Sequence, residues 1–197
     1  MAELRNERET HPRPLPEREG SEYPAKSGAH SNDAPPYREG MGEGLFVSDC
    51  TLESDLEMYF PDQYVPSDSE RMLLYRELDN LRNDQEVEAY RQRLLDRFGT
   101  LPAVAEELIR VVPLRRYGKL LGCEKIMLKQ GRMFLYFVSN ANSPFYQSEA
   151  FGRVLDYIGR NVRRCNLREQ NGRRSMTINE VPTVETAVGV LKEIAGS

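Results

Sequence analysis

The sequence is short of histidine, and the two histidines that it has lie close to its start. His11 and His30 both fall within the first 44 of 197 residues, so residues 45–197 contain none. A Ser-His-Asp or Cys-His mechanism needs an imidazole as general base, and most zinc sites of catalytic type use one as a ligand. Both kinds of site are therefore excluded from residues 45–197.

Cysteine and long apolar runs are scarce as well. Cys50, Cys123 and Cys165 are odd in number, far apart and without a CxxC pair. This pattern predicts free thiols in a reducing compartment, and therefore a cytoplasmic protein. No apolar run approaches the roughly 18 residues that cross a bilayer, and the charged start MAELRNERET is unlike a secretory signal, so we expect no membrane partner.

The glycine-rich loops that bind nucleotides are missing too. The sequence has no G-x-x-x-x-G-K-[ST] motif, and GMGEG at residues 40–44 is not followed by a helical pattern. The DRFG at residues 96–99 differs from the kinase DFG because an arginine separates Asp96 from Phe98, and no H-R-D motif occurs. We therefore predict no catalytic residue, no cofactor and no metal, and we do not expect an enzyme.

The first 44 residues differ in composition from the rest. They hold six of the twelve prolines and almost no large apolar side chains. Such a segment buries too little surface to offset its ordering entropy, which favours a disordered leader over residues 1–44. The alternative is that PRPLP, at residues 12–16, is a ligand for an aromatic-grooved module.

Residues 45–120 read as one strand, an extended connection and three helices. LFVSDCTL (45–52) has strand composition, and residues 53–66 contain two prolines. Ser67 and Asn83, each followed by a glutamate three residues later, predict two helix N-termini. In RLLDRFGTLP (93–102) we expect Gly99 to end the second helix in a left-handed conformation and Thr100 to cap the third. Pro113 predicts a kink or a break in that helix near Val112.

Residues 123–196 predict hairpin, helix, hairpin, helix. CEKIMLK and RMFLYFV flank a QG turn, and CNLREQ and RRSMTINEV flank Asn171-Gly172, a strong type I′ signal. Phe151, Leu155, Ile158 and Val162 are expected on the buried face of the helix between the hairpins, and Thr183 is expected to cap the last helix. The predicted fold class is α+β: an N-terminal helical part, then a ββαββα part whose antiparallel hairpins are covered on one face by helices.

Arginine is concentrated around the second hairpin. The cluster comprises Arg160, Arg163, Arg164, Arg168, Arg173 and Arg174. One interpretation is a patch that binds nucleic acid or an acidic partner, with Arg163, Arg164, Arg168, Arg173 and Arg174 as its residues. The other is a solvated helix end beside a charged strand edge that resists aggregation. A formal net charge of −4 gives the whole chain no general attraction to nucleic acid.

Three stretches together resemble a known family. FPDQYVPSDSERMLLYREL, LLDRFGTLP and KLLGCEKIMLKQGRMFLYF are similar, in order and spacing, to the C-terminal TRCF module of bacterial transcription-repair coupling factor. The specific positions are Pro61, Tyr64, Pro66, Arg71, Leu74, Tyr75, residues 96–99, Pro102, Leu121 and Gly122. The resemblance covers about residues 45–197, which we expect to form one TRCF-like domain.

The resemblance implies a regulatory role without catalysis. In the family this module follows a DNA translocase motor, docks on a UvrB-homology module and thereby masks the surface that recruits UvrA. Release of that contact accompanies engagement of stalled RNA polymerase. The implied interface residues are Arg93, Asp96 and Arg97, because acidic residues just before the R-F-G of the family face arginines of the masked module.

The sequence departs from the family pattern in two places. Asp96 fits one of the acidic positions, but Arg93 stands where a second acid is expected. A proline-rich leader precedes residue 45, where the family has its motor, so we expect a fragment of such a factor or a free-standing module. The alternative function is a small nucleic-acid-binding domain that uses the arginine-rich hairpin at residues 160–174.

Overall fold

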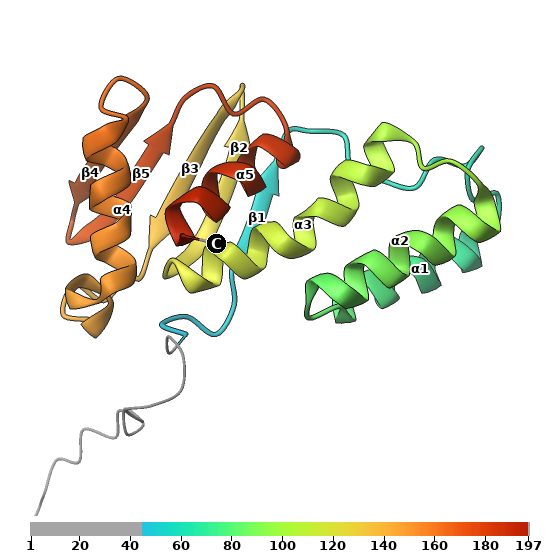
Figure 1. The fold of residues 1–197 in the computed structure, drawn as a ribbon, viewed down its shortest axis with the longest axis horizontal. Coiled ribbons are helices and arrows are strands. Elements are labelled where there is room, and N and C mark those ends of the chain that lie inside the picture. The colour runs from blue at the N-terminus through green and yellow to red at the C-terminus, as the bar shows by residue number, and fades with distance from the viewer. Residues whose placement is uncertain (1–44, 197) are drawn as a thin grey trace, which may run out of the picture. The chain divides into compact units, whose positions relative to one another are not determined.

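A computed structural model describes residues 45–196, and the predictions for residues 1–44, including the disordered leader and PRPLP, lie outside the described residues. The chain forms β1 (Thr51–Ser54), α1 (Asp68–Asn80), α2 (Asp84–Phe98), α3 (Ala103–Leu120), β2 (Cys123–Lys129) and β3 (Arg132–Phe137). A short 3-10 helix (Pro144–Gln147) follows, then α4 (Glu149–Arg160), β4 (Cys165–Gln170), β5 (Arg173–Ile178) and α5 (Val184–Ala195) (Figure 1).

Within residues 45–196, five strands form a single mixed sheet in the order β1-β2-β3-β5-β4. Both predicted hairpins are present and antiparallel, and β3 pairs with β5 to join them. β1 pairs with β2 in parallel, so the first strand lies at the edge of the C-terminal sheet and the three-helix part is the connection between them. The α+β fold class is confirmed.

The strand predicted at residues 45–52 is wrong in its bounds, since β1 covers Thr51–Ser54. The cause is Asp49, whose side chain accepts a 2.8 Å hydrogen bond from the backbone N–H of Cys50 and so bends the chain locally. Val47 and Cys50 are buried there as anchors instead of strand residues.

Both hairpin turns have the conformation that their sequences predict. Asn171 and Gly172 have φ of 54° and 72°, and Gln130 and Gly131 have 52° and 67°. Positive φ at both central residues is the requirement of a type I′ turn. The turn chemistry therefore fixes the register of both hairpins.

The predicted helix starts are confirmed in three cases and wrong in one. The side chains of Ser67, Asn83 and Thr183 each accept a hydrogen bond from the backbone N–H three residues later. Thr100 does not cap α3, because the N-cap is Pro102, whose carbonyl accepts the N–H groups of residues 105 and 106 at 3.0 Å. A proline with φ of −64° is already in the geometry that starts a helix, and Thr100 lies too far upstream to reach the first turn.

Pro113 does not split α3, which runs unbroken from Ala103 to Leu120. Ile109 and Leu114, on either side of the proline, are fully buried in two different hydrophobic clusters. Packing at both places holds the segment helical although one backbone donor is missing. α3 is thus the element shared by the two halves of the core.

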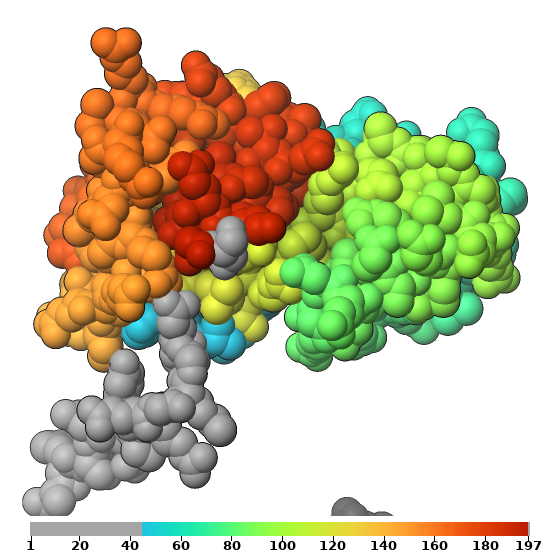
Figure 2. All heavy atoms as spheres, in the orientation of Figure 1, coloured from blue at the N-terminus to red at the C-terminus, as the bar shows by residue number. Residues whose placement is uncertain are grey.

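One cluster joins the sheet to α4, α5 and the second half of α3, and the other joins α1, α2 and the first half of α3. Figures 1 and 2 show α4 and α5 covering the same face of the sheet. The predicted stripe on α4 is partly wrong: Leu155 and Val162 are exposed, whereas Val154 and Tyr157 are buried. Among the described residues, no helix is both long enough and apolar enough to span a bilayer.

Candidate partner interface at the end of α2

A buried tyrosine from the segment before α1 forms hydrogen bonds to the corner between α2 and α3. The hydroxyl of Tyr64 donates to the carbonyls of Leu94 and Gly99, 3.1 Å away in each case. Its ring lies 5.6 Å from the ring of Phe98, centroid to centroid. Burial, followed by the negative charge of Glu106, raises the pKa of Tyr64, so the phenol stays protonated and donating. The last turn of α2 is therefore held in one position.

The start of α1 is fixed in a similar way by Arg71. Its guanidinium donates to the carbonyl of Val65 at 2.6 Å, forms an ion pair with Asp62 at 3.2 Å and also pairs with Asp68. The carbonyl of Pro61 accepts the backbone N–H groups of Tyr64 and Val65, both at 2.9 Å. Several positions that carry the family resemblance thus build the rigid base of the helical hairpin.

The two predicted interface arginines form ion pairs with glutamates of the same chain. Arg93 forms an ion pair with Glu77 and Arg97 forms one with Glu70, so both link α2 to α1. The capping box predicted for α1 is accordingly half formed, because Glu70 binds Arg97 instead of reaching back to residue 67. The guanidinium groups also lie over aromatic rings, Arg93 at 5.7 Å from Tyr90 and Arg97 at 5.2 Å from Phe98.

Asp96 differs from its two neighbours. It is exposed, and it makes no ion pair with any described residue. A helical residue turns about 100° from the one before it, so Asp96 lies to one side of Arg97 and next to Arg93, three residues earlier. The structure therefore pairs Arg93 and Arg97 with α1 and leaves Asp96 exposed, without an ion-pair partner among the described residues.

A shallow hollow of about 120 Å³ lies between α1 and α2 beside these residues. Its lining is apolar at the base and charged at the rim, and comprises Leu74, Glu77, Tyr90, Arg93, Leu94, Arg97 and Phe98. The hydroxyl of Tyr90 at the base donates to the carbonyl of Leu74 at 3.0 Å, and burial raises its pKa. The hollow is suited to a side chain from a partner, and is too small for a cofactor.

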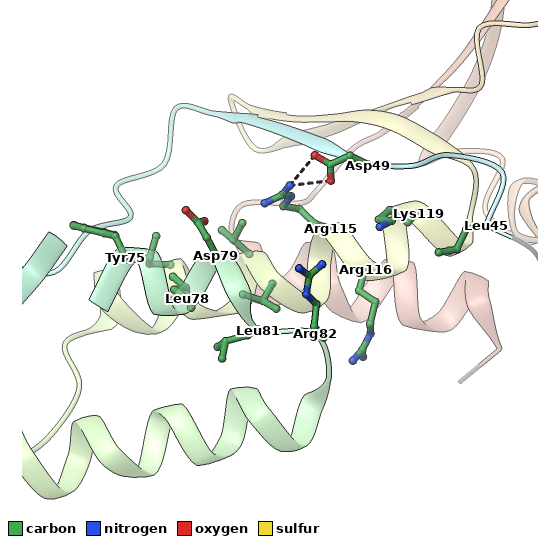
Figure 3. A pocket seen from close by; sticks show the side chains of 13 residues that line it. Leu45, Asp49, Tyr75, Leu78, Asp79, Leu81, Arg82, Arg115, Arg116 and Lys119 are labelled. Carbon is green, nitrogen blue, oxygen red and sulfur yellow. Dashed lines mark hydrogen bonds and ion pairs between the residues drawn. The ribbon is translucent and has the colours of Figure 1, made fainter. Parts of the chain in front are cut away.

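A larger hollow of about 330 Å³ lies where the end of α1, the middle of α3 and residues 45–49 meet (Figure 3). Arg115 binds the carboxylate of Asp49 at 2.8 and 3.0 Å and donates to the carbonyl of Cys50 at 2.9 Å. Burial opposes ionisation of Asp49, but the Cys50 N–H and Arg115 outweigh it and lower the pKa of Asp49. These groups join the segment just before β1 to α3.

The chemistry of the cysteines is that of core residues. Cys50, Cys123 and Cys165 are buried and unpaired, which confirms the prediction of free thiols. Burial raises the pKa of Cys50 to about 12 and that of Cys123 well above its ordinary value, so neither is a thiolate near neutral pH. Within residues 45–196, no group of three or more His, Cys, Asp or Glu side chains is placed to hold a metal ion.

The arginines of the alternative nucleic-acid patch do not share one surface. Arg164 donates to the carbonyls of Asn179 and Glu180 at 2.9 and 3.0 Å, and Arg174 pairs with Glu169 at 2.9 Å on the side of the sheet that the helices cover. Arg168 and Arg173 lie on the other side of the sheet, as the register of β4 and β5 shows. Arg163 is exposed in the turn between α4 and β4.

The described residues thus define a mixed-sheet α+β domain whose helical hairpin presents a rigid, charged corner. Residues 54–148 match the family model of the TRCF domain. The crystal structure of a C-terminal domain of transcription-repair coupling factor aligns with a TM-score of 0.56 at 18% identity, over 75% of this chain and 94% of that one. The predicted resemblance is confirmed: residues 54–148 are similar to the TRCF domain.

Curated relatives give the same family name. The transcription-repair-coupling factor of Rickettsia bellii (strain RML369-C) is 31% identical over 101 residues, which are 51% of this chain and 9% of the relative. That of Rickettsia typhi is 26% identical over 131 residues, 66% of this chain and 11% of the relative. That of Escherichia coli K12 is 29% identical over 89 residues, 45% of this chain and 8% of the relative. The match is to the TRCF domain and includes no motor domain.

Proposed function

We propose that the chain is a regulatory interaction module of transcription-coupled nucleotide excision repair and acts by reversible docking, without catalysing a reaction. The partner is a UvrB-homology module, on the same or another chain, and docking covers the surface that recruits UvrA. Release of the contact accompanies engagement of stalled RNA polymerase. The names of the relatives, which join transcription to repair, support this role, although the chain spans only about a tenth of their length.

The observation that carries the proposal is the state of Asp96. It is exposed and unpaired among the described residues, on a helical turn that Tyr64 holds through the carbonyls of Leu94 and Gly99. A charge on a rigid support loses little entropy on binding and gives register and specificity to a docked partner. An arginine of the partner is the natural counterpart of this carboxylate.

The ion pair between Arg93 and Glu77 supports the same interface. An arginine at this position would repel a basic partner if its charge were uncompensated, but the carboxylate of Glu77 on α1 neutralises it. The neighbouring hollow, with Leu74, Tyr90 and Leu94 in its lining, offers an apolar contact beside the charge. The proposed interface is therefore Asp96 together with the rim formed by Arg93 and Arg97.

Binding of the full chain to the cognate UvrB-homology module, measured by calorimetry, tests the proposal. Asp96→Arg should weaken binding by about tenfold or more, because juxtaposed like charges cost several kcal/mol. Asp156→Arg is the matched control, since Asp156 is an exposed helical aspartate on α4. Equal affinities of the wild type and Asp96→Arg would refute the interface, and equal losses in both variants would point to overall charge instead.

A second experiment addresses masking. A complex of the chain with the UvrB-homology module should bind UvrA more weakly than the free module does, and the Asp96→Arg variant should restore UvrA binding. If UvrA binds the complex and the free module equally well, the docked face is not the one that recruits UvrA.

A further inference from the structure

The side of the sheet opposite the helices carries a second cluster of residues with binding chemistry. The strand register puts Lys125, Tyr136, Ser175 and Arg168 in one row across four strands, and Met127, Phe134, Thr177 and Asn166 in the next. Residues on either side of these in each strand, such as Ile126, Leu135 and Met176, point to the other side and are fully buried. Because side chains alternate along a strand, the two rows lie on the face that α4 and α5 do not cover.

Two aromatic rings are available on this uncovered face. Phe134 and Tyr136 belong to neither hydrophobic cluster, and Tyr136 is 36% exposed. They are two residues apart on β3, which separates them by roughly 7 Å along the strand. Each ring can therefore take a separate planar group stacked on it.

The same face is strongly positive although the chain as a whole is acidic. Lys125, Lys129, Arg132, Arg168 and Arg173 lie on it by register, and in the paired rows Glu53 is the single carboxylate. Lys125 binds Glu53 at 2.6 Å, whereas the other four cations form no ion pair with any described residue. The formal net charge of the whole chain is −4, so the positive charge of this face is opposite in sign to that of the whole chain.

Each ring also has a cation over it. The ammonium of Lys125 lies 5.8 Å from the ring centre of Tyr136, and the guanidinium of Arg132 lies 5.6 Å from that of Phe134. Arg168 and Arg173 stand at the far side of the face, on β4 and β5. Stacking surfaces in the middle and cations at both margins are what a strand with planar bases and a negative backbone requires.

We propose that this uncovered face, defined by Lys125, Phe134, Tyr136, Arg168 and Arg173, binds a single-stranded nucleic acid. The bases stack on Phe134 and Tyr136, and the phosphates lie along the cations of β2, β4 and β5. A paired duplex would hide its base faces and leave the rings unused. The site lies on the sheet and not on α2, so it is independent of the docking proposed for Asp96.

Fluorescence anisotropy of labelled oligonucleotides with the full chain is the test, with oligo-dT and oligo-U as single strands and a hairpin duplex as the competitor. We expect at least one of the two single strands to bind, and to bind more tightly than the duplex. Tyr136→Ala should weaken binding by about 5- to 100-fold, and Tyr136→Phe should keep it, because stacking needs only the ring. Phe134→Ala should act in the same direction.

The cations give a second, separable readout. Arg168→Gln and Arg173→Gln should each lower the slope of log affinity against log salt by about 0.7, the value for one phosphate contact on a single strand. Arg160→Gln is the matched control, because Arg160 is an exposed arginine at the end of α4 and not on the sheet. It should leave the slope unchanged.

Several results would overturn the proposal. They are no binding of either single strand at low salt, binding that Tyr136→Ala leaves intact in a folded variant, and a duplex bound as tightly as a single strand. Binding of an acidic protein by this face with no affinity for oligonucleotides would equally reject it. Circular dichroism of each variant shows that lost binding is not lost folding.

Discussion

Gly122 lies against the ring of Phe145 so closely that a Cβ at residue 122 would come within 2.5 Å of it. Gly122 has φ of +64° and joins the end of α3 to the start of β2, and its carbonyl accepts the N–H of Val138 at 2.9 Å. The ring of Phe145 in turn lies 5.8 Å from that of Phe137 and 5.3 Å from that of Phe151. The contact fixes where the sheet begins relative to its aromatic core.

Gly122→Ala should therefore destabilise the protein by about 2–5 kcal/mol, from left-handed strain and overpacking together. Gly99→Ala provides the comparison, since Gly99 has φ of +81° and ψ of −157°, and a Cβ at residue 99 would meet no atom within 4 Å. Backbone strain alone should cost that variant about 1–3 kcal/mol, because its φ and ψ lie in a region that essentially only glycine adopts. Urea unfolding of both variants measures the difference, and a larger loss for Gly99→Ala would contradict the assigned contact.

Tyr64→Phe should destabilise the fold by about 1–2 kcal/mol, because it removes the hydroxyl that donates to the carbonyls of Leu94 and Gly99. Tyr157→Phe is the matched control. The hydroxyl of Tyr157 is also buried, but it has no hydrogen-bond partner among the described residues, so its removal should cost far less. Thermal unfolding of the two variants distinguishes them, and equal shifts would mean that the hydroxyl of Tyr64 does not hold the corner.

Arg93 and Glu77 should couple weakly but measurably. Their side chains are 55% and 43% exposed, and exposed ion pairs are worth about 0.2–1 kcal/mol. Arg93→Glu should therefore lower stability slightly by placing like charges together, and adding Glu77→Arg should recover the loss. The free energies of unfolding of the two single variants and the double variant give the coupling, and a double variant less stable than either single one would argue against the pair.

The cysteines should make stability fall in alkaline solution. The pKa of Cys50 is raised from 9.0 to about 12 by burial, so the folded state keeps its proton where the unfolded state loses it. The contribution is present below pH 9 and disappears as the pH rises toward 12. Cys50→Ser should flatten this decline in unfolding experiments at increasing pH.

The burial of the three thiols predicts their reactivity as well. They should react with a disulfide reagent slowly when the chain is folded and quickly in urea, and fast labelling of the folded chain would refute their burial.

Local sequence signals predicted the elements well. The turn and the three helix caps depend on residues a few positions apart, so the local sequence is sufficient to predict them. They are the turn at Asn171-Gly172 and the caps at Ser67, Asn83 and Thr183. The hairpins and the α+β class follow from such signals. The end of α2 at Phe98 and the positive φ of Gly99 were likewise predictable, but the left-handed conformation predicted for Gly99 is wrong, since its ψ of −157° lies outside that region.

Features that depend on distant partners were not predictable in this way. The parallel pairing of β1 with β2 joins residues more than 70 positions apart, and nothing in residues 51–54 names that partner. Leu155 and Val162 fit a helical stripe, yet the sheet and α5 meet α4 along Val154 and Tyr157 instead. Helical spacing predicts that a face is buried, and packing decides which one.

The candidate interface shows the same division. The sequence singled out Arg93, Asp96 and Arg97 together, but only the fold shows that Glu77 and Glu70 on α1 take the two arginines and leave Asp96 exposed. On the sheet, the alternation of RMFLYF puts Phe134 and Tyr136 on one face of β3, but only the structure shows that this face lies opposite the core. Their proximity to Arg168 required the pairing of β3 with β5 and of β5 with β4.

The position of β1 has a practical consequence for dissecting the chain. A piece cut to the family match, residues 54–148, would lose β1 on one side of the β2–β3 hairpin and β5 on the other. Two strands rich in apolar residues would then have both of their outer backbone edges unsatisfied, which invites edge-to-edge aggregation. A fragment that folds should therefore contain all five strands of the sheet and the core residues packed on it. It extends at least from Val47 to Ile194, well beyond the residues that match the family.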